Sequence, residues 1–309
     1  MKDLTQLDPV GLRTLATAVR LGTFELAARE MHVTASAVSQ RIKALETRVG
    51  RVLVHRVKPL EPTEAGHVLI RLAAQTELLE AEALAELTDQ LPEDEQGDPA
   101  ERPYTSVPLA VNSDALYTWL VDALVAIQAR HRVTFELIRE DQTRTAELLR
   151  RGEAMAAVTA DPRPVPGCRV VKLGTMRYLA VCTPAWKETH LVGGTLAEDL
   201  GRAPMIAFDR SDTLQHDFLR RVTRRHLTPP VNWIPSVAEF DNAVRRGMGW
   251  GMLLDHECAR DLARGRLVEI APGRKVDVPL YWQHWRLESP LMTDLTEAIS
   301  AAATRWMAR

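Results

Sequence analysis

The chain has 309 residues, which is enough for two domains of ordinary size or for a small domain joined to a large one. Hydrophobic residues make up 46% of the chain and charged residues 26%, as is typical of a globular protein with a buried core. No stretch reaches the roughly 18 uncharged residues of a membrane span, and the N-terminal residues lack the apolar core of a signal peptide. We therefore expect a cytoplasmic protein without membrane contact.

The formal net charge of −2 hides an uneven distribution along the chain. Ten lysines and arginines face five acidic residues within residues 1–60, whereas Arg71 is the only lysine or arginine in residues 61–100. This contrast predicts a module that binds a polyanion, followed by a segment that does not. Cys168, Cys182 and Cys258 match no metal or disulfide spacing, so we expect buried thiols and no metal site.

Three short helices are predicted at the N-terminus. Apolar residues from Leu12 to Val19 recur at helical spacing and predict a first helix, which Gly22 ends. Thr23 and Thr34 are suitable N-caps for two further helices.

The third helix has two different faces. Val38, Ile42 and Leu45 form an apolar stripe, and the opposite face is polar and cationic. Such a helix, packed by one side on two others, is typical of the recognition helix of a helix-turn-helix, whose Gln, Arg and Lys side chains pair with base edges. Residues 51–63 indicate a hairpin with a basic tip that reaches phosphates, which makes the motif winged. The predicted DNA-binding residues are Thr34, Ser36, Ser39, Gln40, Arg41, Lys43, Arg56 and Lys58.

Charge alone leaves open that this basic face is merely solvated. The helix caps, the small residues Ala27 and Ala28 at the helix crossing and the basic hairpin favour the DNA-binding motif over that alternative.

Residues 63–87 form one long predicted helix. Leu69, Leu72 and Leu79 belong to a 3-4-3-4 apolar spacing, which is the pattern of a coiled-coil seam. A helix of this kind needs a partner for its apolar face, and a second copy of the chain is the obvious one. The segment PEDEQGDPAERP, residues 92–103, has the composition of a linker.

Beyond residue 104 short apolar runs of strand type alternate with amphipathic helical segments. The runs include VPLAVN, TFELIRE, AMAAVTA, YLAVCT, PMIAFD and PLYWQHW. This alternation predicts an α/β domain with largely parallel sheets.

The segment FELAAREMHVTASAVSQRIKALETRVGRVLVHRVKPLEPTEAG resembles the N-terminal signature of LysR-type transcriptional regulators. The Ala-Ala pair, the S-A-V-S-Q core and the closing P-T-E-A-G occur in the same order. S-Q-R-I-K-A-L-E, together with AVNSDALYTWL, RRGMGWGMLL and YWQHWRLES, is similar to the branch of that family that answers basic amino acids and controls lysine and arginine export.

This resemblance implies an N-terminal all-α winged helix-turn-helix, a long dimerisation helix and a C-terminal effector domain resembling a periplasmic binding protein, with two α/β subdomains. The implied bounds are residues 1–62 for the DNA-binding domain, 63–103 for the dimerisation helix and linker, and 104–309 for the effector domain. Within the effector domain, subdomain I takes residues 104–175 and 275–309, and subdomain II takes residues 176–274.

In such an effector domain a ligand lies between the two subdomains, at strand ends and helix N-termini. A basic amino acid needs hydroxyl and N–H groups for its carboxylate and carboxylates for its cationic groups. The candidate residues follow predicted strands, with Trp119 as a pocket wall. They are Ser113, Trp119, Asp141, Thr159, Asp209, Ser236 and Glu239. The serine, threonine and aspartate residues among them also suit an ordinary helix N-cap, which remains an alternative for each of them.

The expected function is sequence-specific transcriptional activation of a lysine or arginine exporter gene in response to lysine, arginine or histidine. A LysR-type regulator that answers another small molecule is the alternative. The expected partners are double-stranded DNA, the effector, RNA polymerase and further copies of the chain, as a homodimer or homotetramer. The chain carries no legible catalytic motif, so we expect neither an enzyme nor a cofactor.

Overall fold

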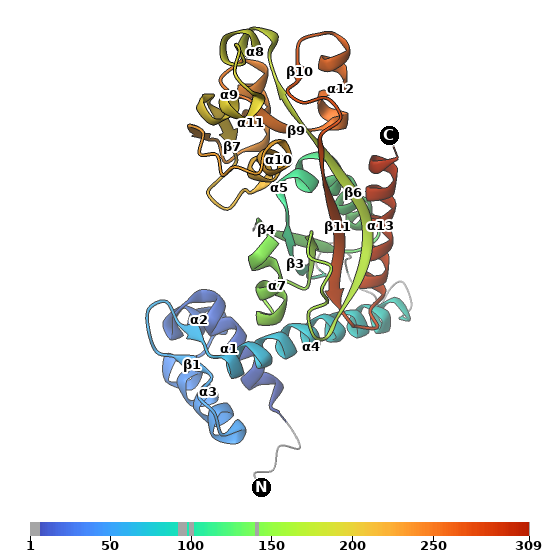
Figure 1. Cartoon of the computed structure of the whole chain (residues 1–309). Helices are drawn as coiled ribbons and strands as arrows, with labels where there is room; N and C mark the ends of the chain where they lie inside the picture. The colour runs from blue at the N-terminus through green and yellow to red at the C-terminus, as the bar shows by residue number, and fades with distance from the viewer. Residues whose placement is uncertain (1–6, 92–97, 99–101, 140–141, 309) are drawn as a thin grey trace.

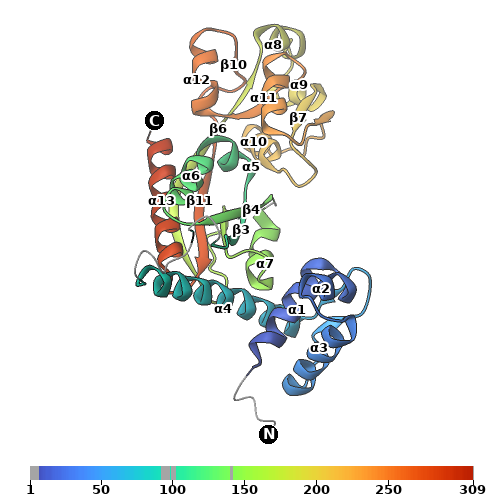
Figure 2. The same cartoon turned by 180° about the vertical axis from the view of Figure 1, so that it is seen from behind.

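The computed structural model describes residues 7–91, 98, 102–139 and 142–308. Most of the predicted linker, residues 92–103, lies outside the described residues, and so does Asp141. The chain forms a small N-terminal head, one long helix and a larger C-terminal part with two lobes (Figures 1 and 2). No described helix has both the length and the apolar character that crossing a membrane requires.

The head is a three-helix unit with a small hairpin. Its elements are α1 (Pro9–Leu21), α2 (Phe24–Glu30), α3 (Ala35–Val49), β1 (Val54–His55) and β2 (Glu61–Pro62), and the two strands pair antiparallel. Thr23 and Thr34 cap α2 and α3 as predicted, each with its hydroxyl accepting a backbone N–H at 3.1 Å. Gly22 and Gly50 end α1 and α3 in the left-handed conformation, at φ of 77° and 74°, which glycine adopts without steric cost.

Helix α4 (Glu64–Asp89) belongs to two hydrophobic cores at once. Leu69 and Ala73 pack into the core of the head, with α1 and α3. Leu78, one turn further on, is 1% exposed and packs into the core of the C-terminal part. Leu69, predicted as part of a seam between two chains, is therefore buried within its own chain, whereas Leu72 and Leu79 are exposed.

The C-terminal part is built on a seven-stranded sheet. Along its main path the order is β10-β6-β11-β5-β3-β4, and β9 also pairs with β6. The strands are β3 (Thr105–Val111), β4 (Val133–Arg139), β5 (Ala156–Thr159), β6 (Cys168–Cys182), β9 (Gly251–Leu254), β10 (Val268–Glu269) and β11 (Lys275–Trp285).

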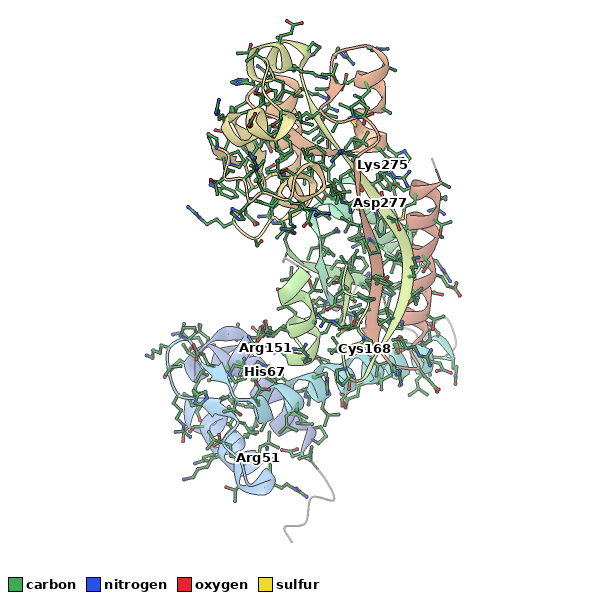
Figure 3. All side chains as sticks on the ribbon, in the orientation of Figure 1. Arg51, His67, Arg151, Cys168, Lys275 and Asp277 are labelled. Carbon is green, nitrogen blue, oxygen red and sulfur yellow. The ribbon has the colours of Figure 1, made fainter. Side chains whose placement is uncertain are left out.

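The prediction of largely parallel sheets is wrong for this sheet. Only β3 pairs parallel with its neighbours β4 and β5, whereas β6 pairs antiparallel with β9, β10 and β11, and β11 with β5. The reason is that β6 and β11 are long strands that run in opposite directions between the two lobes. Figure 3 labels Cys168, where β6 begins near α4, and Lys275, where β11 begins near the far lobe.

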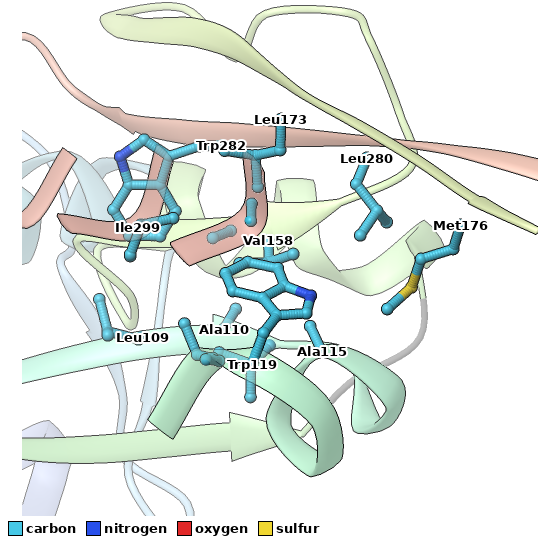
Figure 4. Close-up of a cluster of buried hydrophobic side chains, with 14 of the residues drawn as sticks. Leu109, Ala110, Ala115, Trp119, Val158, Leu173, Met176, Leu280, Trp282 and Ile299 are labelled. Atoms are coloured by element: carbon cyan, nitrogen blue, oxygen red, sulfur yellow. The ribbon is translucent and has the colours of Figure 1, made fainter. Parts of the chain in front are cut away.

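We call the lobe built on β3, β4 and β5 the first lobe. Its helical segments are α5 (Ser113–Ala115), a π-helical turn (Leu116–Leu120), α6 (Val121–Gln128), α7 (Gln142–Arg151) and α13 (Pro290–Met307). Trp119 and Trp282 are 2% and 0% exposed and lie in its core with Leu109, Val158 and Ile299 (Figure 4).

The second lobe surrounds β9, β10 and the parallel pair β7 (Met205–Ala207) and β8 (Val231–Trp233). Its helices are α8 (Pro184–His190), α9 (Leu196–Arg202), α10 (Leu214–Val222), α11 (Val237–Arg245) and α12 (Asp255–Ala263). Gly251 sits in β9 because a Cβ there would lie 2.8 Å from the Val244 side chain, so α11 can pack directly on this strand. The two lobes meet along β6 and β11, and a cavity lies at their junction.

Candidate functional site

The polar face of α3 is open to solvent. Ser36, Gln40 and Lys43 are exposed, and Ser39 and Arg41 are half-buried. The opposite face is buried, since Val38 and Ile42 are 0% exposed in the core of the head. The α3 surface is therefore free to enter a groove that is wide enough for a helix.

The hairpin is held against the rest of the head by polar contacts. Glu46, the single acidic residue of α3, accepts a hydrogen bond from the Leu53 backbone N–H at 2.9 Å, which ties α3 to the start of the hairpin. Arg56, at the exposed tip, places its guanidinium 5.8 Å from the centre of the Phe24 ring on α2. Thr34 is exposed, but its hydroxyl already caps α3. Arg56 and Lys58 thus present exposed positive charge on the hairpin, with Arg56 next to α2.

A cavity of about 1190 Å³ lies between the two lobes. The first lobe contributes Ser113 and Asp114 from the start of α5, and the second contributes residues from the β7–α10 loop, α10, α11 and β9. Tyr178 of β6 and Asp277 of β11 line it from the crossing strands. Seven carboxylate side chains and four arginines line this cavity, so its charge is net negative. Such a lining favours a ligand with more positive than negative groups.

Two of the predicted effector residues line this cavity. Ser113 is half-buried at the N-terminal end of the α5 segment. Asp209 follows β7, and its Oδ1 accepts hydrogen bonds from the backbone N–H and hydroxyl of Ser211, at 2.8 and 2.6 Å. Asp209 therefore also shapes its own loop, but it caps no helix, since α10 begins at Leu214.

The other described candidates lie outside the cavity lining. Trp119 is buried in the core of the first lobe, so the prediction that it forms a pocket wall is corrected: it lies on the turn of helix that faces the sheet (Figure 4). Thr159 is 3% exposed, and its hydroxyl accepts the Asp161 N–H at 3.2 Å. Ser236 donates a hydrogen bond to Glu239 within the first turn of α11, and this bond lowers the pKa of Glu239.

Asp114 and Tyr178 form a polar pair at the cavity wall that the sequence does not single out. The Tyr178 hydroxyl donates a hydrogen bond to Oδ2 of Asp114 at 2.6 Å. Burial raises the pKa of Asp114, the Tyr178 bond opposes this effect, and the nearby charge of Asp212 adds to it. Burial and the charge of Asp114 raise the pKa of Tyr178 well above its usual value, so that the hydroxyl remains a donor. Asp114 directly follows the predicted site residue Ser113, but 64 residues separate it from Tyr178.

Two further side chains of the second lobe bring acceptor atoms without a hydrogen-bond partner among the described residues. These atoms are Oε1 of Gln215 on α10 and Oδ1 of Asp241 on α11, and both residues line the cavity. The other oxygen of Asp241 pairs with Arg245, which Asp261 holds in turn at 2.6 Å. Buried acceptors rarely remain unpaired, so each indicates a donor that a ligand or water supplies. Within the described residues, no group of three or more metal-ligating side chains was found.

The comparisons with known proteins cover almost the whole chain. A family profile described as "Bacterial regulatory helix-turn-helix protein, lysR family" matches residues 10–67, and one described as "LysR substrate binding domain" matches residues 101–304. The chain is 44% identical over 299 residues to the HTH-type transcriptional regulator LysG of Mycobacterium tuberculosis, covering 97% of this chain and 94% of that protein. It is 40% identical to the lysine export transcriptional regulatory protein LysG of Corynebacterium glutamicum, covering 96% of this chain and 98% of that protein.

A solved structure of full-length LysG from Corynebacterium glutamicum with bound effector Arg is similar along the whole chain. It superimposes with a TM-score of 0.79 at 39% sequence identity and covers 97% of this chain and 99% of that one.

Proposed function

The chain belongs to the LysR family of bacterial regulatory helix-turn-helix proteins, and we propose that it activates an amino-acid exporter gene in response to a basic amino acid, namely lysine, arginine or histidine. One observation carries the ligand assignment. The cavity between the lobes has an excess of carboxylates, which suits a ligand with two cationic groups and one carboxylate. The names of the similar regulators, and the arginine bound to one of them, support the same class of effector.

In this proposal the effector's carboxylate lies at the start of the α5 segment, where Ser113 and backbone N–H groups are available. Its cationic groups face Asp209, Asp114 and Asp241, all of which line the cavity. Closing the two lobes around the ligand brings these groups together from both sides of the cavity. Asp141 stays a prediction, since it lies outside the described residues. Thr159, Ser236 and Glu239 remain predictions as well, with positions that favour structural roles.

The head is proposed to bind an operator in the cytoplasm. Residues 1–62 form the DNA-binding domain, with Ser36, Ser39, Gln40, Arg41 and Lys43 of α3 in the major groove. Arg56 and Lys58 contact flanking phosphates, and Thr34 positions the helix start. Two chains pair through the helix of residues 63–87 within the segment 63–103, and two such dimers join through the effector domains, residues 104–309. RNA polymerase is the partner that contacts the DNA-bound assembly.

Ligand can switch such an assembly only by binding one arrangement of it more tightly than the other. A thermal-shift panel of the twenty amino acids on the full chain tests the effector class, because a ligand of the native state raises the melting temperature. We expect lysine, arginine or histidine to raise it at millimolar concentration and neutral amino acids to leave it unchanged. A shift only with acidic or neutral compounds would favour the regulator that answers another small molecule.

A further inference from the structure

Asp114 is an unusual carboxyl group because it faces a ligand cavity and is paired with a hydroxyl instead of a cation. It lies in the first turn of α5, and its Oδ2 accepts the Tyr178 hydroxyl at 2.6 Å. The carboxylate of Asp212, in the loop before α10, is a like charge that acts on it. Both burial and a neighbouring like charge favour the neutral form of an acid.

The other charged groups that line the cavity do not neutralise Asp114. They come from β4, the β7–α10 loop, α10, α11, α12 and β11. The acidic ones are Asp209, Asp217, Asp241, Glu257 and Asp277, and the basic ones are Arg139, Arg210, Arg220 and Arg221. The Arg210 guanidinium lies 5.6 Å from the centre of the Trp233 ring, Arg220 pairs with Asp217, and Arg221 donates a hydrogen bond to the Lys275 carbonyl oxygen. Arg139 is turned toward the second lobe, with its guanidinium 5.5 Å from the centre of the Phe208 ring and its Nη1 3.5 Å from the Pro235 carbonyl oxygen. Asp241 pairs with Arg245 and Asp277 with Arg177. The described lining contains no histidine or cysteine.

We propose that a proton and a cationic group of the effector compete for Asp114, so that binding of a basic amino acid releases a proton from this carboxyl group. This inference rests on the proposed function. The O–H bond of the neutral carboxyl group breaks, its electron pair stays on the Asp114 oxygen, and the proton passes to the buffer. The resulting carboxylate pairs with the ammonium or guanidinium group of the ligand, while the Tyr178 hydroxyl remains its donor.

The sign of the pH dependence follows from this exchange. Above the pKa of Asp114 in the empty protein the carboxylate is free and the affinity for arginine is at its maximum. Below that pKa a proton must leave first, and the affinity falls about tenfold for each pH unit until the pKa of the ligand-bound state is reached. Burial raises this pKa in the empty fold, so an ionised Asp114 lowers the stability of the empty protein as the pH rises. A cationic group of the bound ligand stabilises the ionised Asp114 and so offsets this loss of stability.

Isothermal titration calorimetry of the full chain with arginine and with lysine tests the exchange. At each pH between 5 and 8 the titration is repeated in two buffers with different enthalpies of ionisation, and the difference in heat counts the protons released. We expect the release to approach one proton per ligand at the acidic end and to fall toward zero as the pH rises. The dissociation constant for arginine should rise by up to tenfold for each unit by which the pH falls.

Variants assign the proton to its residue. Asp114→Asn should abolish the proton release, flatten the pH dependence and weaken arginine binding, while it raises the melting temperature of the empty protein. Asp122→Asn is the matched control, because Asp122 is exposed on α6 and outside the cavity lining, and it should behave like the wild type. Tyr178→Phe removes the hydrogen-bond donor that favours the Asp114 carboxylate, so the proton release should move to higher pH. If Asp114→Asn does not fold, this shift in Tyr178→Phe tests the assignment of the proton to Asp114.

The outcomes separate this inference from the function on which it rests. Arginine or lysine binding without buffer-dependent heat would overturn the exchange and leave the proposed effector class intact. Proton release that persists in Asp114→Asn would overturn the assignment to this residue. If arginine, lysine and histidine all fail to bind at every pH, the proposed effector class itself is wrong.

Discussion

At the scale of single residues, base recognition and phosphate contact are separate tasks of the head. Gln40 is exposed in the middle of the polar face of α3, where a side chain amide can form two hydrogen bonds with adenine. Arg56 is exposed at the hairpin tip beside Phe24, and we propose that its guanidinium contacts phosphates of the duplex. Only contacts of the first kind distinguish one DNA sequence from another.

We predict that Gln40→Ala weakens binding to the operator by about 1–3 kcal/mol, or roughly 5- to 150-fold, and leaves binding to unrelated DNA unchanged, because a base contact is lost and phosphate contacts remain. Fluorescence anisotropy with operator and scrambled duplexes at several salt concentrations measures the affinity for each duplex and its dependence on salt. Arg56→Ala is the contrasting variant: it should weaken binding to both duplexes alike and reduce the salt slope by about one. Equal losses on both duplexes for Gln40→Ala would contradict the assignment of Gln40 to base reading.

Residues that follow a strand and precede a helix were predictable as candidates for the ligand site, since such positions meet at one edge of a sheet. Ser113 and Asp209 line the cavity, whereas Ser236, which follows β8 and precedes α11, lies outside its lining. Tyr178 was not predictable, because it lies within a long strand and reaches Asp114 only through the path of β6 between the lobes. Trp119 was misplaced because the spacing of a helix shows which residues share a face but not whether that face meets the sheet or the cavity.

At the scale of elements, the sequence predicts the caps and lengths of the head helices well, because Thr23, Thr34, Gly22 and Gly50 act through local hydrogen bonds and φ values. The direction of strand pairing is not local. The apolar run in β6 is compatible with either direction, and its antiparallel partners come from residues 251–285, far along the chain. The burial of the α4 leucines is likewise not predictable from local spacing. The same apolar pattern includes residues in an internal core and residues on an exposed stripe.

Two neighbouring leucines of α4 separate these roles. Leu78 is 1% exposed in the core of the C-terminal part, whereas Leu79 is 41% exposed on the stripe with Leu72. We predict that Leu78→Ala lowers the free energy of unfolding by about 2–5 kcal/mol, because it leaves a cavity. Leu79→Ala should change the unfolding of the single chain little, yet raise the dissociation constant of the dimer about tenfold or more, since symmetry removes the leucine from both copies.

Urea unfolding and sedimentation equilibrium of the two alanine variants distinguish the effects, and each variant is the matched control of the other. A dimer of Leu79→Ala as tight as that of the wild type would contradict the pairing of two chains through this stripe of α4.

At the scale of the whole molecule, α4 fixes the head and the first lobe to one another. The Glu82 carboxylate accepts the Ser289 hydroxyl at 2.6 Å and the Leu291 N–H at 3.1 Å, so that α4 caps the start of α13. Near the other end of α4, a Cβ on Gly152 would lie 2.7 Å from Cα of Arg71, and the buried His67 lies against Arg151 (Figure 3). These contacts join the head to the first lobe through α4.

This arrangement predicts that Glu82 transmits the effector signal without touching the effector. Glu82→Ala removes two hydrogen bonds to a charged acceptor, each of about 1.5–3 kcal/mol, and loosens the first lobe on α4. We expect arginine to bind the variant within twofold of the wild-type affinity, while the arginine-dependent change in DNase I footprint and in transcription from the operator is lost or strongly reduced. Glu86→Ala is the control, because Glu86 is exposed one turn further along the same helix. If Glu82→Ala responds to arginine as fully as Glu86→Ala does, the signal reaches the heads by contacts between chains and not through α4.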